Sequence, residues 1–269
     1  MTAPQHPAQP ARAARRPAHS EIHWDEVGDE SHPLIALVHG AMDRSAGLLR
    51  LSRWLDHDHR VLRYDRRGYG RSAPHPGPFS MEYQVADLAQ LLRGRKAVVV
   101  GHSYGGNVAL ALAARHPELV RGVVTYESPV SWVPWWPSAT PSSAAIERAD
   151  DTAAAAEGFM RRLIGSDRWD ALPERTRATR RAEGAALVGE LADLRAHEPW
   201  KPHEITVPVW VGVGEHASRH QQQGMRHVAD VLPDARLVVL PGCHHMANAT
   251  HPELFRRLLI DPLLRHLAD

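Results

Sequence analysis

The sequence predicts an α/β protein with a doubly wound, mostly parallel sheet and a helical insertion in the second half of the chain. Three observations predict this fold class. Short apolar runs alternate with amphipathic helical stretches over residues 21–127, which is typical of parallel strands joined by right-handed crossovers. Residues 128–200 contain no strand-like run. The alternation returns over residues 201–269, so one sheet is expected to continue beyond the insertion.

The expected strands and helices of the first part follow from the residue pattern. Residues 21–27 alternate between apolar and polar side chains and end at Gly28, which favours an edge strand. Residues 34–38 are apolar throughout, as expected of a strand buried on both faces of a parallel sheet. The other expected strands are 61–64, 96–100 and 121–126, and the expected helices are 46–55, 80–92 and 108–114.

The second part begins with a proline-rich stretch and continues with Ala- and Arg-rich helical segments. Strands are then expected at 207–213 and 235–240, with helices at 220–232 and from residue 251 onward. The chain is thus expected to consist of a core, residues 21–127 and 201–269, and an insertion, residues 128–200. Residues 1–20 are rich in Ala, Pro and Arg and lack an apolar segment, which favours a disordered leader over a secretory signal.

Composition narrows the class of function. A net charge of +1 gives no support for a nucleic-acid partner or an anionic membrane surface. No apolar run approaches the ~20 residues that span a bilayer, so no membrane span is expected. The single cysteine, Cys243, cannot form an internal disulfide, and a cytoplasmic location is expected. The 19 histidines are scattered without the spacing of metal ligands, so no metal site is expected.

The most informative stretch joins strand 96–100 to the following helix and reads Gly101-His102-Ser103-Tyr104-Gly105. A turn this sharp forces its apical residue, Ser103, into strained backbone geometry and requires small neighbours. The Ser103 hydroxyl is then exposed at the positive end of a helix, where backbone N–H groups can receive a developing oxyanion. The pattern therefore predicts Ser103 as a nucleophile.

Other stretches accompany this turn in a recognisable order, and from about residue 22 onward the chain resembles the α/β-hydrolase fold superfamily. They are Leu37-Val38-His39-Gly40, Tyr64-Asp65-Arg66-Arg67-Gly68-Tyr69-Gly70-Arg71-Ser72, Pro208-Val209-Trp210-Val211-Gly212-Val213-Gly214-Glu215 and Pro241-Gly242-Cys243-His244-His245. The resemblance implies the α/β-hydrolase fold with a helical cap, residues 128–200, and a serine hydrolase of the esterase type. It is far less informative about the substrate.

The resemblance also implies that a histidine after the last strand takes the proton of Ser103, because serine is a weak nucleophile at its own pKa. His244 and His245 are both candidates. Alignment on Pro252, which opens the last helix, favours His245 and leaves His244 where the family usually has glycine.

The acid of the triad departs from the usual pattern. The family usually carries it in a Gly-Glu-x-Asp-like string, where this chain has Ala217. Alanine cannot orient an imidazole or stabilise imidazolium. Some members carry the acid after the strand that follows the nucleophile's helix, and here that residue is Glu127, at the same carboxyl edge of the sheet as Ser103. Glu127 is therefore the predicted acid, with Glu215 as the alternative.

The resemblance implies two backbone donors for an oxyanion hole: the N–H of Tyr104 and the N–H of Ala41, with Met42 as the alternative to Ala41. It also implies that residues 65–72 form a structural turn in which arginine and aspartate pair. Cys243 is expected to be a buried loop residue rather than a nucleophile.

Three tryptophans at the start of the predicted cap, Trp132, Trp135 and Trp136, follow Glu127 closely. They either line the entrance to the site or pack the cap onto the core. If they line it, an apolar portion of a small-molecule substrate is expected to bind there.

The expected function is that of a serine hydrolase, without a metal or organic cofactor, that cleaves a small to medium carboxylic ester, lactone or thioester through an acyl-enzyme. A cofactor-free perhydrolase or a C–C bond hydrolase would use the same triad. A non-catalytic ligand-binding member is the alternative from another class, and Ala217 favours it. Epoxide hydrolases and haloalkane dehalogenases are disfavoured, because their nucleophile at this turn is aspartate. The substrate and the oligomeric state are left open.

Overall fold

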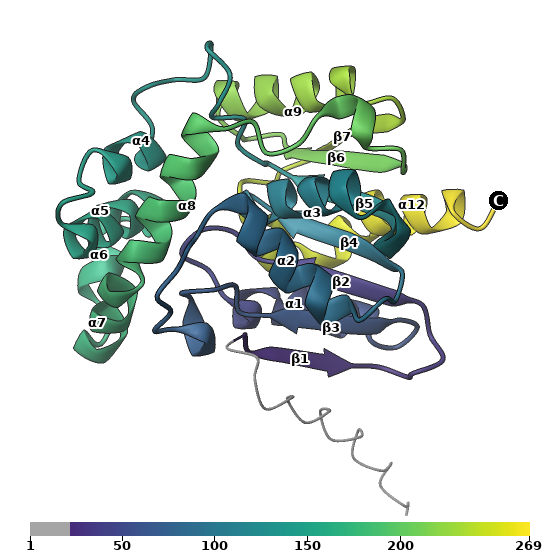
Figure 1. The fold of residues 1–269 in the computed structure, drawn as a ribbon, viewed down its shortest axis with the longest axis horizontal. Helices are drawn as coiled ribbons and strands as arrows, with labels where there is room; N and C mark the ends of the chain where they lie inside the picture. The colour runs from purple at the N-terminus through teal and green to yellow at the C-terminus, as the bar shows by residue number, and fades with distance from the viewer. Residues whose placement is uncertain (1–21) are drawn as a thin grey trace, which may run out of the picture.

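The computed structural model describes residues 22–269, so the predicted leader, residues 1–20, lies outside the described residues. A seven-stranded sheet forms the centre of the fold, in the order β1-β3-β2-β4-β5-β6-β7 (Figure 1). β1 is antiparallel to β3, and every other pairing is parallel. The strands are β1 (Trp24–Val27), β2 (Leu34–Val38), β3 (Arg60–Tyr64), β4 (Ala97–His102), β5 (Val120–Tyr126), β6 (Val209–Gly214) and β7 (Ala235–Leu240).

The order of the strands decides where a site can form. β3 lies on one side of β2 and β4 lies on the other, so the direction of winding reverses between them. In open α/β sheets, ligands bind beyond the carboxyl ends of the strands at such a reversal. The loops after β2 and β4 meet there.

Helices cover both faces of the sheet because its buried strands are apolar on both sides. In β4, Val99 belongs to a hydrophobic cluster that includes residues of α2, α3 and α9, whereas Val98 and Val100 belong to a second cluster with residues of α1 and the C-terminal helices. The helices of the core are α1 (Leu49–Leu55), α2 (Met81–Leu92), α3 (Tyr104–Arg115), α9 (Arg219–Val231), α10 (Ala247–Thr250), α11 (Pro252–Phe255) and α12 (Asp261–His266). Shorter 3-10 and π-helical segments are η1 (Ser45–Leu48), η2 (Gly70–Ser72), η3 (Pro117–Leu119), η4 (Pro202–Glu204) and η5 (Arg256–Ile260).

Residues 128–200 form helices α4 to α8, which lie together at one end of the sheet, on the left in Figure 1. These helices are α4 (Pro141–Ile146), α5 (Thr152–Ile164), α6 (Ser166–Asp170), α7 (Glu174–Ala182) and α8 (Gly184–Ala196). We call them the cap. None of the described helices combines the length and the apolar character needed to cross a membrane.

The predicted α/β class is confirmed, and the elements differ from expectation mainly at their ends. β4 continues to His102 rather than ending at Val100, because His102 still pairs with Tyr126 of β5. The last helix, expected to be continuous from residue 251, is divided into α11, η5 and α12.

Candidate active site

Ser103 stands at the junction of β4 and α3 with φ 54° and ψ −125°, a conformation that costs free energy in a residue with a side chain. Its N–H donates to the Tyr126 carbonyl over 2.8 Å, which helps to hold the strained backbone. Two glycines make the turn possible. A Cβ on Gly101 would collide with the backbone of Gly105, and one on Gly105 would collide with the Val38 carbonyl. The sharp turn expected around Ser103 is therefore present.

Glu127 lies at the end of β5 with its side chain fully buried. Its Oε2 lies 2.7 Å from Nδ1 of His245, and its Oε1 accepts a hydrogen bond of 2.9 Å from the N–H of Gly214. A buried carboxylate requires such partners, because leaving an ionised group unpaired away from water is costly. The contact leaves Nε2 as the nitrogen of His245 that can accept a proton.

The alternative base, His244, and the alternative acid, Glu215, lie away from this contact. His244 is exposed, with its ring 4.9 Å from the ring of His216. Glu215 is exposed and accepts a hydrogen bond from the N–H of Gly242. The structure thus brings Glu127 and His245 together, and neither His244 nor Glu215 takes part in that contact.

The loop after β2 runs directly beside the serine. A Cβ on Gly40 would lie 2.9 Å from Cβ of Ser103. Ala41 and Met42, the two candidates for one oxyanion donor, lie on the wall of the same cavity as Ser103. Tyr104, which carries the other expected donor, is the first residue of α3.

A cavity of about 160 Å³ adjoins Ser103 and His245. Its remaining wall is mostly apolar and comes from the loop after β2, from α5 and from the loop before α10. The lining residues other than Ser103 and His245 are Ala41, Met42, Asp43, His102, Phe159, Met160, Leu163, Ile164, Arg180 and Met246.

Trp132, Trp135 and Trp136, for which the sequence left two alternatives open, are not among the residues that line this cavity. Trp132 packs edge-on against Trp200 at 5.5 Å, and Trp136 is buried 4.9 Å from the ring of His220. Trp135 is exposed beside His227. Trp135 and Trp136 thus contact α9 of the core, whereas Trp132 contacts another residue of the insertion. The apolar wall of the cavity comes mainly from α5.

His102, the residue before the serine, is fully buried, and its Nε2–H donates to the His245 carbonyl over 2.8 Å. Burial, together with the neighbouring His245, lowers the pKa of His102 to about 3. His102 is therefore a neutral donor that fixes the backbone of His245.

The pattern that defines the alpha/beta hydrolase family matches residues 35–258 of the chain. The chain belongs to the α/β hydrolase family. A solved relative of this hydrolase, the enol-lactonase from Burkholderia xenovorans LB400, has a TM-score of 0.71 at 24% identity, over 91% of this chain and 96% of that chain. That likeness shows the fold.

Relatives with similar sequences carry the names of hydrolytic enzymes. The 2-(acetamidomethylene)succinate hydrolase of Mesorhizobium japonicum is 26% identical over 83% of this chain and 85% of its own length. The pimeloyl-(acyl-carrier protein) methyl ester esterase of Yersinia enterocolitica is 27% identical over 90% of this chain and 96% of its own length. The protein is an enzyme with hydrolase activity.

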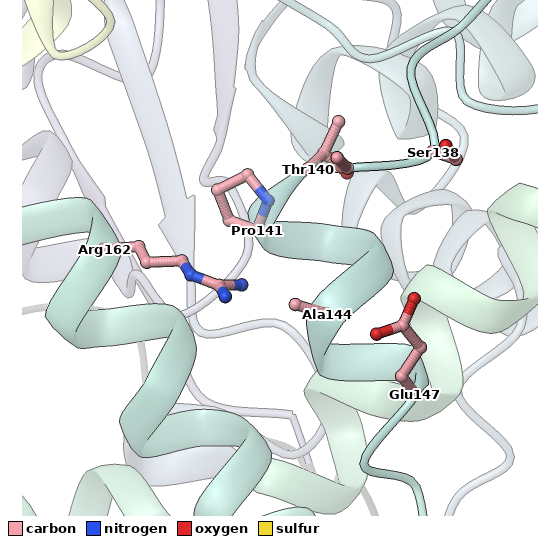
Figure 2. Close-up of a pocket in the computed structure, with 7 residues that line it drawn as sticks. Ser138, Thr140, Pro141, Ala144, Glu147 and Arg162 are labelled. Atoms are coloured by element: carbon pink, nitrogen blue, oxygen red, sulfur yellow. The ribbon is translucent and has the colours of Figure 1, made fainter.

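A larger cavity of the hydrolase, about 480 Å³, lies within the cap between α4 and α5 (Figure 2). Figure 2 shows Arg162 and Glu147 projecting from these two helices. Neither Ser103 nor His245 lines this cavity. Size therefore does not identify the site, and the smaller cavity is the one that adjoins the reactive side chains. Across residues 22–269, no group of three His, Cys, Asp or Glu side chains is arranged to hold a metal ion.

Sequence reasoning missed several residues around the site of the hydrolase. The amide nitrogen of Gln221 at the start of α9 lies 3.2 Å from Nδ1 of His245. The 65–72 turn is only partly as expected: Arg71 lies 3.6 Å from Asp65, but Arg66 pairs with Glu190 of the cap. A buried arginine needs an acidic partner, but no pattern in the sequence could identify Glu190, which lies 124 residues after Arg66. Cys243 is buried, as predicted.

Proposed function

We propose that the protein is a serine hydrolase that cleaves a small to medium carboxylic ester, or a lactone or thioester, through an acyl-enzyme on Ser103. The observation that carries the proposal is the 2.7 Å contact between Nδ1 of His245 and the buried Glu127, at a cavity that Ser103 shares. A nucleophile, a base and a residue that orients the base make up the set that acyl transfer requires.

The chemistry follows from these positions. The Ser103 hydroxyl attacks the substrate carbonyl carbon while His245 Nε2 takes its proton. The negative Glu127 stabilises the imidazolium and keeps the proton on Nδ1 in the resting state. His245 then protonates the leaving alcohol, thiol or hydroxyl as the tetrahedral intermediate collapses to the acyl-enzyme. Water repeats the sequence and releases the carboxylic acid.

The N–H groups of Ala41 and Tyr104 are proposed to hold the oxyanion of the tetrahedral intermediate. Ala41 is on the loop after β2 and lines the same cavity as Ser103, and Tyr104 follows Ser103 as the first residue of α3. Donors aimed at the developing charge act strongly in a site that excludes water, and losing one costs about 10²–10³ in kcat in such enzymes. Main-chain donors also explain why no side chain in the cavity has to supply this role.

The cavity limits the substrate. A volume of about 160 Å³ is well below the roughly 300–1,000 Å³ of pockets that enclose drug-sized ligands. Its apolar wall, from Phe159, Met160, Leu163 and Ile164, favours an apolar substrate portion. Two relatives, a methyl ester esterase and a hydrolase of an acetamido compound, carry names that are consistent with acyl transfer to water.

A fluorophosphonate probe tests the proposal on the intact protein. We expect covalent labelling of the wild-type chain, no labelling of Ser103→Ala, and much slower labelling of His245→Gln. p-Nitrophenyl esters of increasing acyl length should be hydrolysed, with short chains preferred. A folded wild-type protein that is not labelled and binds these esters without turnover would contradict the proposal and favour a ligand-binding role.

A further inference from the structure

The carbonyls of residues 39–42, the loop expected to supply an oxyanion donor, are held by arginine side chains. Arg66 donates from Nε to the His39 carbonyl over 2.9 Å and from Nη2 to the Gly40 carbonyl over 3.0 Å. Arg180, from α7 of the cap, donates from Nη1 to the Met42 carbonyl over 3.0 Å. Three of the four carbonyls in this loop therefore accept from a guanidinium.

The two arginines are in turn paired with acidic residues of the cap. Nη1 and Nη2 of Arg66 lie 2.5 Å and 3.2 Å from the carboxylate oxygens of Glu190 on α8. Arg180 lies 3.0 Å from Glu183, between α7 and α8. The side chains of Glu190 and Glu183 are fully buried, as is that of Arg66. A buried ion pair of this kind is expensive to open, because either charge left alone lacks solvent.

Planarity of the peptide bond connects these contacts to the oxyanion donor. The Gly40 carbonyl and the Ala41 N–H belong to one trans peptide and point in opposite directions. Nδ1–H of His39 also donates to the Gly40 carbonyl, over 2.8 Å, so two donors fix this peptide plane. The His39 ring is fixed as well, because its Nε2 accepts the Arg66 backbone N–H over 2.8 Å. The direction of Ala41 N–H thus follows from where Arg66 lies.

We propose that Glu190 is a positioning residue of the cap: it holds Arg66 so that the peptide of Gly40 presents the Ala41 N–H to the oxyanion at Ser103. Glu183 supports the far end of the same loop through Arg180 and Met42. The inference rests on the proposed function, since it concerns the oxyanion of that reaction. The cap then contributes part of the catalytic geometry as well as the wall of the cavity.

Three variants distinguish an effect on the orientation of the Gly40 peptide from an effect of the charge on Arg66 or Glu190. Glu190→Gln removes the negative charge from Arg66 with little change of shape. Arg66→Lys keeps a charge for Glu190, but a single ammonium cannot reproduce the forked donors to His39 and Gly40. The double variant Arg66→Met with Glu190→Leu removes both charges together, which proteins often tolerate. Circular dichroism and thermal melting identify which variants are folded.

A second cap glutamate offers a matched control. Glu157 on α5 also pairs with two arginines, Arg161 at 2.8 Å and Arg181 at 2.7 Å. Within residues 22–269, the arginines that donate to the carbonyls of residues 39–42 are Arg66 and Arg180, and not these two. Glu157→Gln should leave the kinetics unchanged. Because it removes the same charge from the same cap, a change shared by Glu157→Gln and Glu190→Gln would point to general loosening of the cap.

The measurements are kcat and KM for a p-nitrophenyl ester and the affinities of two inhibitors of one shape. The Ser103 oxygen adds to the carbonyl carbon of a trifluoromethyl ketone while His245 takes its proton, and the ketone oxygen becomes an oxyanion. The matching methyl ketone stays neutral. In the folded variants at Glu190 and Arg66 we expect kcat to fall about 10- to 100-fold, with KM changed less than about threefold. Trifluoromethyl ketone affinity should fall by more than about tenfold, and methyl ketone affinity by less than about threefold.

The outcomes distinguish the two proposals. Equal losses for both ketones, or unchanged kcat in the folded variants, would overturn the positioning role while wild-type turnover upholds the proposed function. A wild-type protein with neither turnover nor labelling would overturn the proposed function, and the positioning role with it.

Discussion

Oε2 of Glu127 lies 2.7 Å from Nδ1 of His245, although 118 residues separate them in the chain. β5 delivers the carboxylate and the loop after β7 delivers the imidazole, both at the carboxyl edge of the sheet. The usual position of the acid, at Ala217, is occupied by a side chain that cannot serve. This contact is the basis for the proposal that Glu127 orients His245, and a comparison of Glu127 with Glu215 tests it.

Glu127→Gln should lower kcat by about 10²–10⁴, because an amide neither stabilises imidazolium nor enforces the tautomer of His245. Glu215→Gln should change kcat less than about threefold, since that exposed side chain accepts a hydrogen bond from the N–H of Gly242 and takes no part in the contact between Glu127 and His245. Steady-state hydrolysis of a p-nitrophenyl ester measures both. Comparable losses in the two variants, or the opposite ranking, would refute the assignment.

Gln221 is expected to hold the ring of His245 in place by packing beside its Nδ1 edge. Its amide lies 3.2 Å from Nδ1 and is itself held by Ser218, whose hydroxyl lies 3.0 Å from Oε1. Because Nδ1–H is directed to Glu127, Gln221 can limit rotation of the ring by packing beside it but cannot donate to Nδ1. Gln221→Ala should lower kcat about three- to tenfold with little change in KM, because the ring then loses this neighbour. The adjacent Gln222→Ala is the control, since among the described residues the amide of Gln222 donates to the carbonyls of Glu215 and Ala217 and not to His245. A loss of equal size in both variants would argue against a specific role.

The wall from α5 should determine the preferred acyl length. Phe159→Ala enlarges the cavity beside Ser103, so kcat/KM for longer p-nitrophenyl esters should rise about tenfold relative to the acetate, in line with the worth of one or two methylenes. Trp135→Ala should leave this chain-length profile unchanged, because Trp135 is exposed and does not line the cavity. A profile shifted by Trp135→Ala and not by Phe159→Ala would restore the tryptophan interpretation.

Folding stability should fall as the pH drops below about 6.5. The buried His102 has a pKa of about 3 against its usual 6.5, and burial also lowers the pKa of His39. Between pH 6.5 and the lowered pKa of the folded state, these histidines bind protons in the unfolded chain but not in the folded protein. Their contribution to the free energy of unfolding is therefore complete above pH 6.5. Below it, the contribution decreases by up to about 1.4 kcal/mol per pH unit for each histidine. Urea unfolding at pH 7.5, 6.5 and 5.5 measures it.

His102→Asn serves as the control for that dependence, because it removes one titrating group. The slope of unfolding free energy against pH should decrease by about one proton below pH 6.5 in this variant. Slopes that coincide for wild type and variant would show that His102 does not remain neutral in the folded state.

Local patterns were sufficient for the elements of the fold, and they failed where partners lie far apart in the chain. β2 and β7 have the predicted bounds, since an apolar run between turn residues has few alternatives. β4 is longer than predicted, because pairing with β5 extends it through the polar His102. The tryptophans show the same limit: an aromatic side chain near a site in sequence can equally pack a cap onto its core.

The sequence by itself determined the fold class, the sharp turn at Ser103 and a short set of candidate bases and acids. Periodicity and glycine placement encode these features over a few residues. Only the tertiary structure decided that Glu127 faces His245, that α5 lines the cavity, and that Glu190 holds Arg66. These pairings depend on how separate elements meet at one edge of the sheet, and a buried charge can take its partner from any element that reaches it.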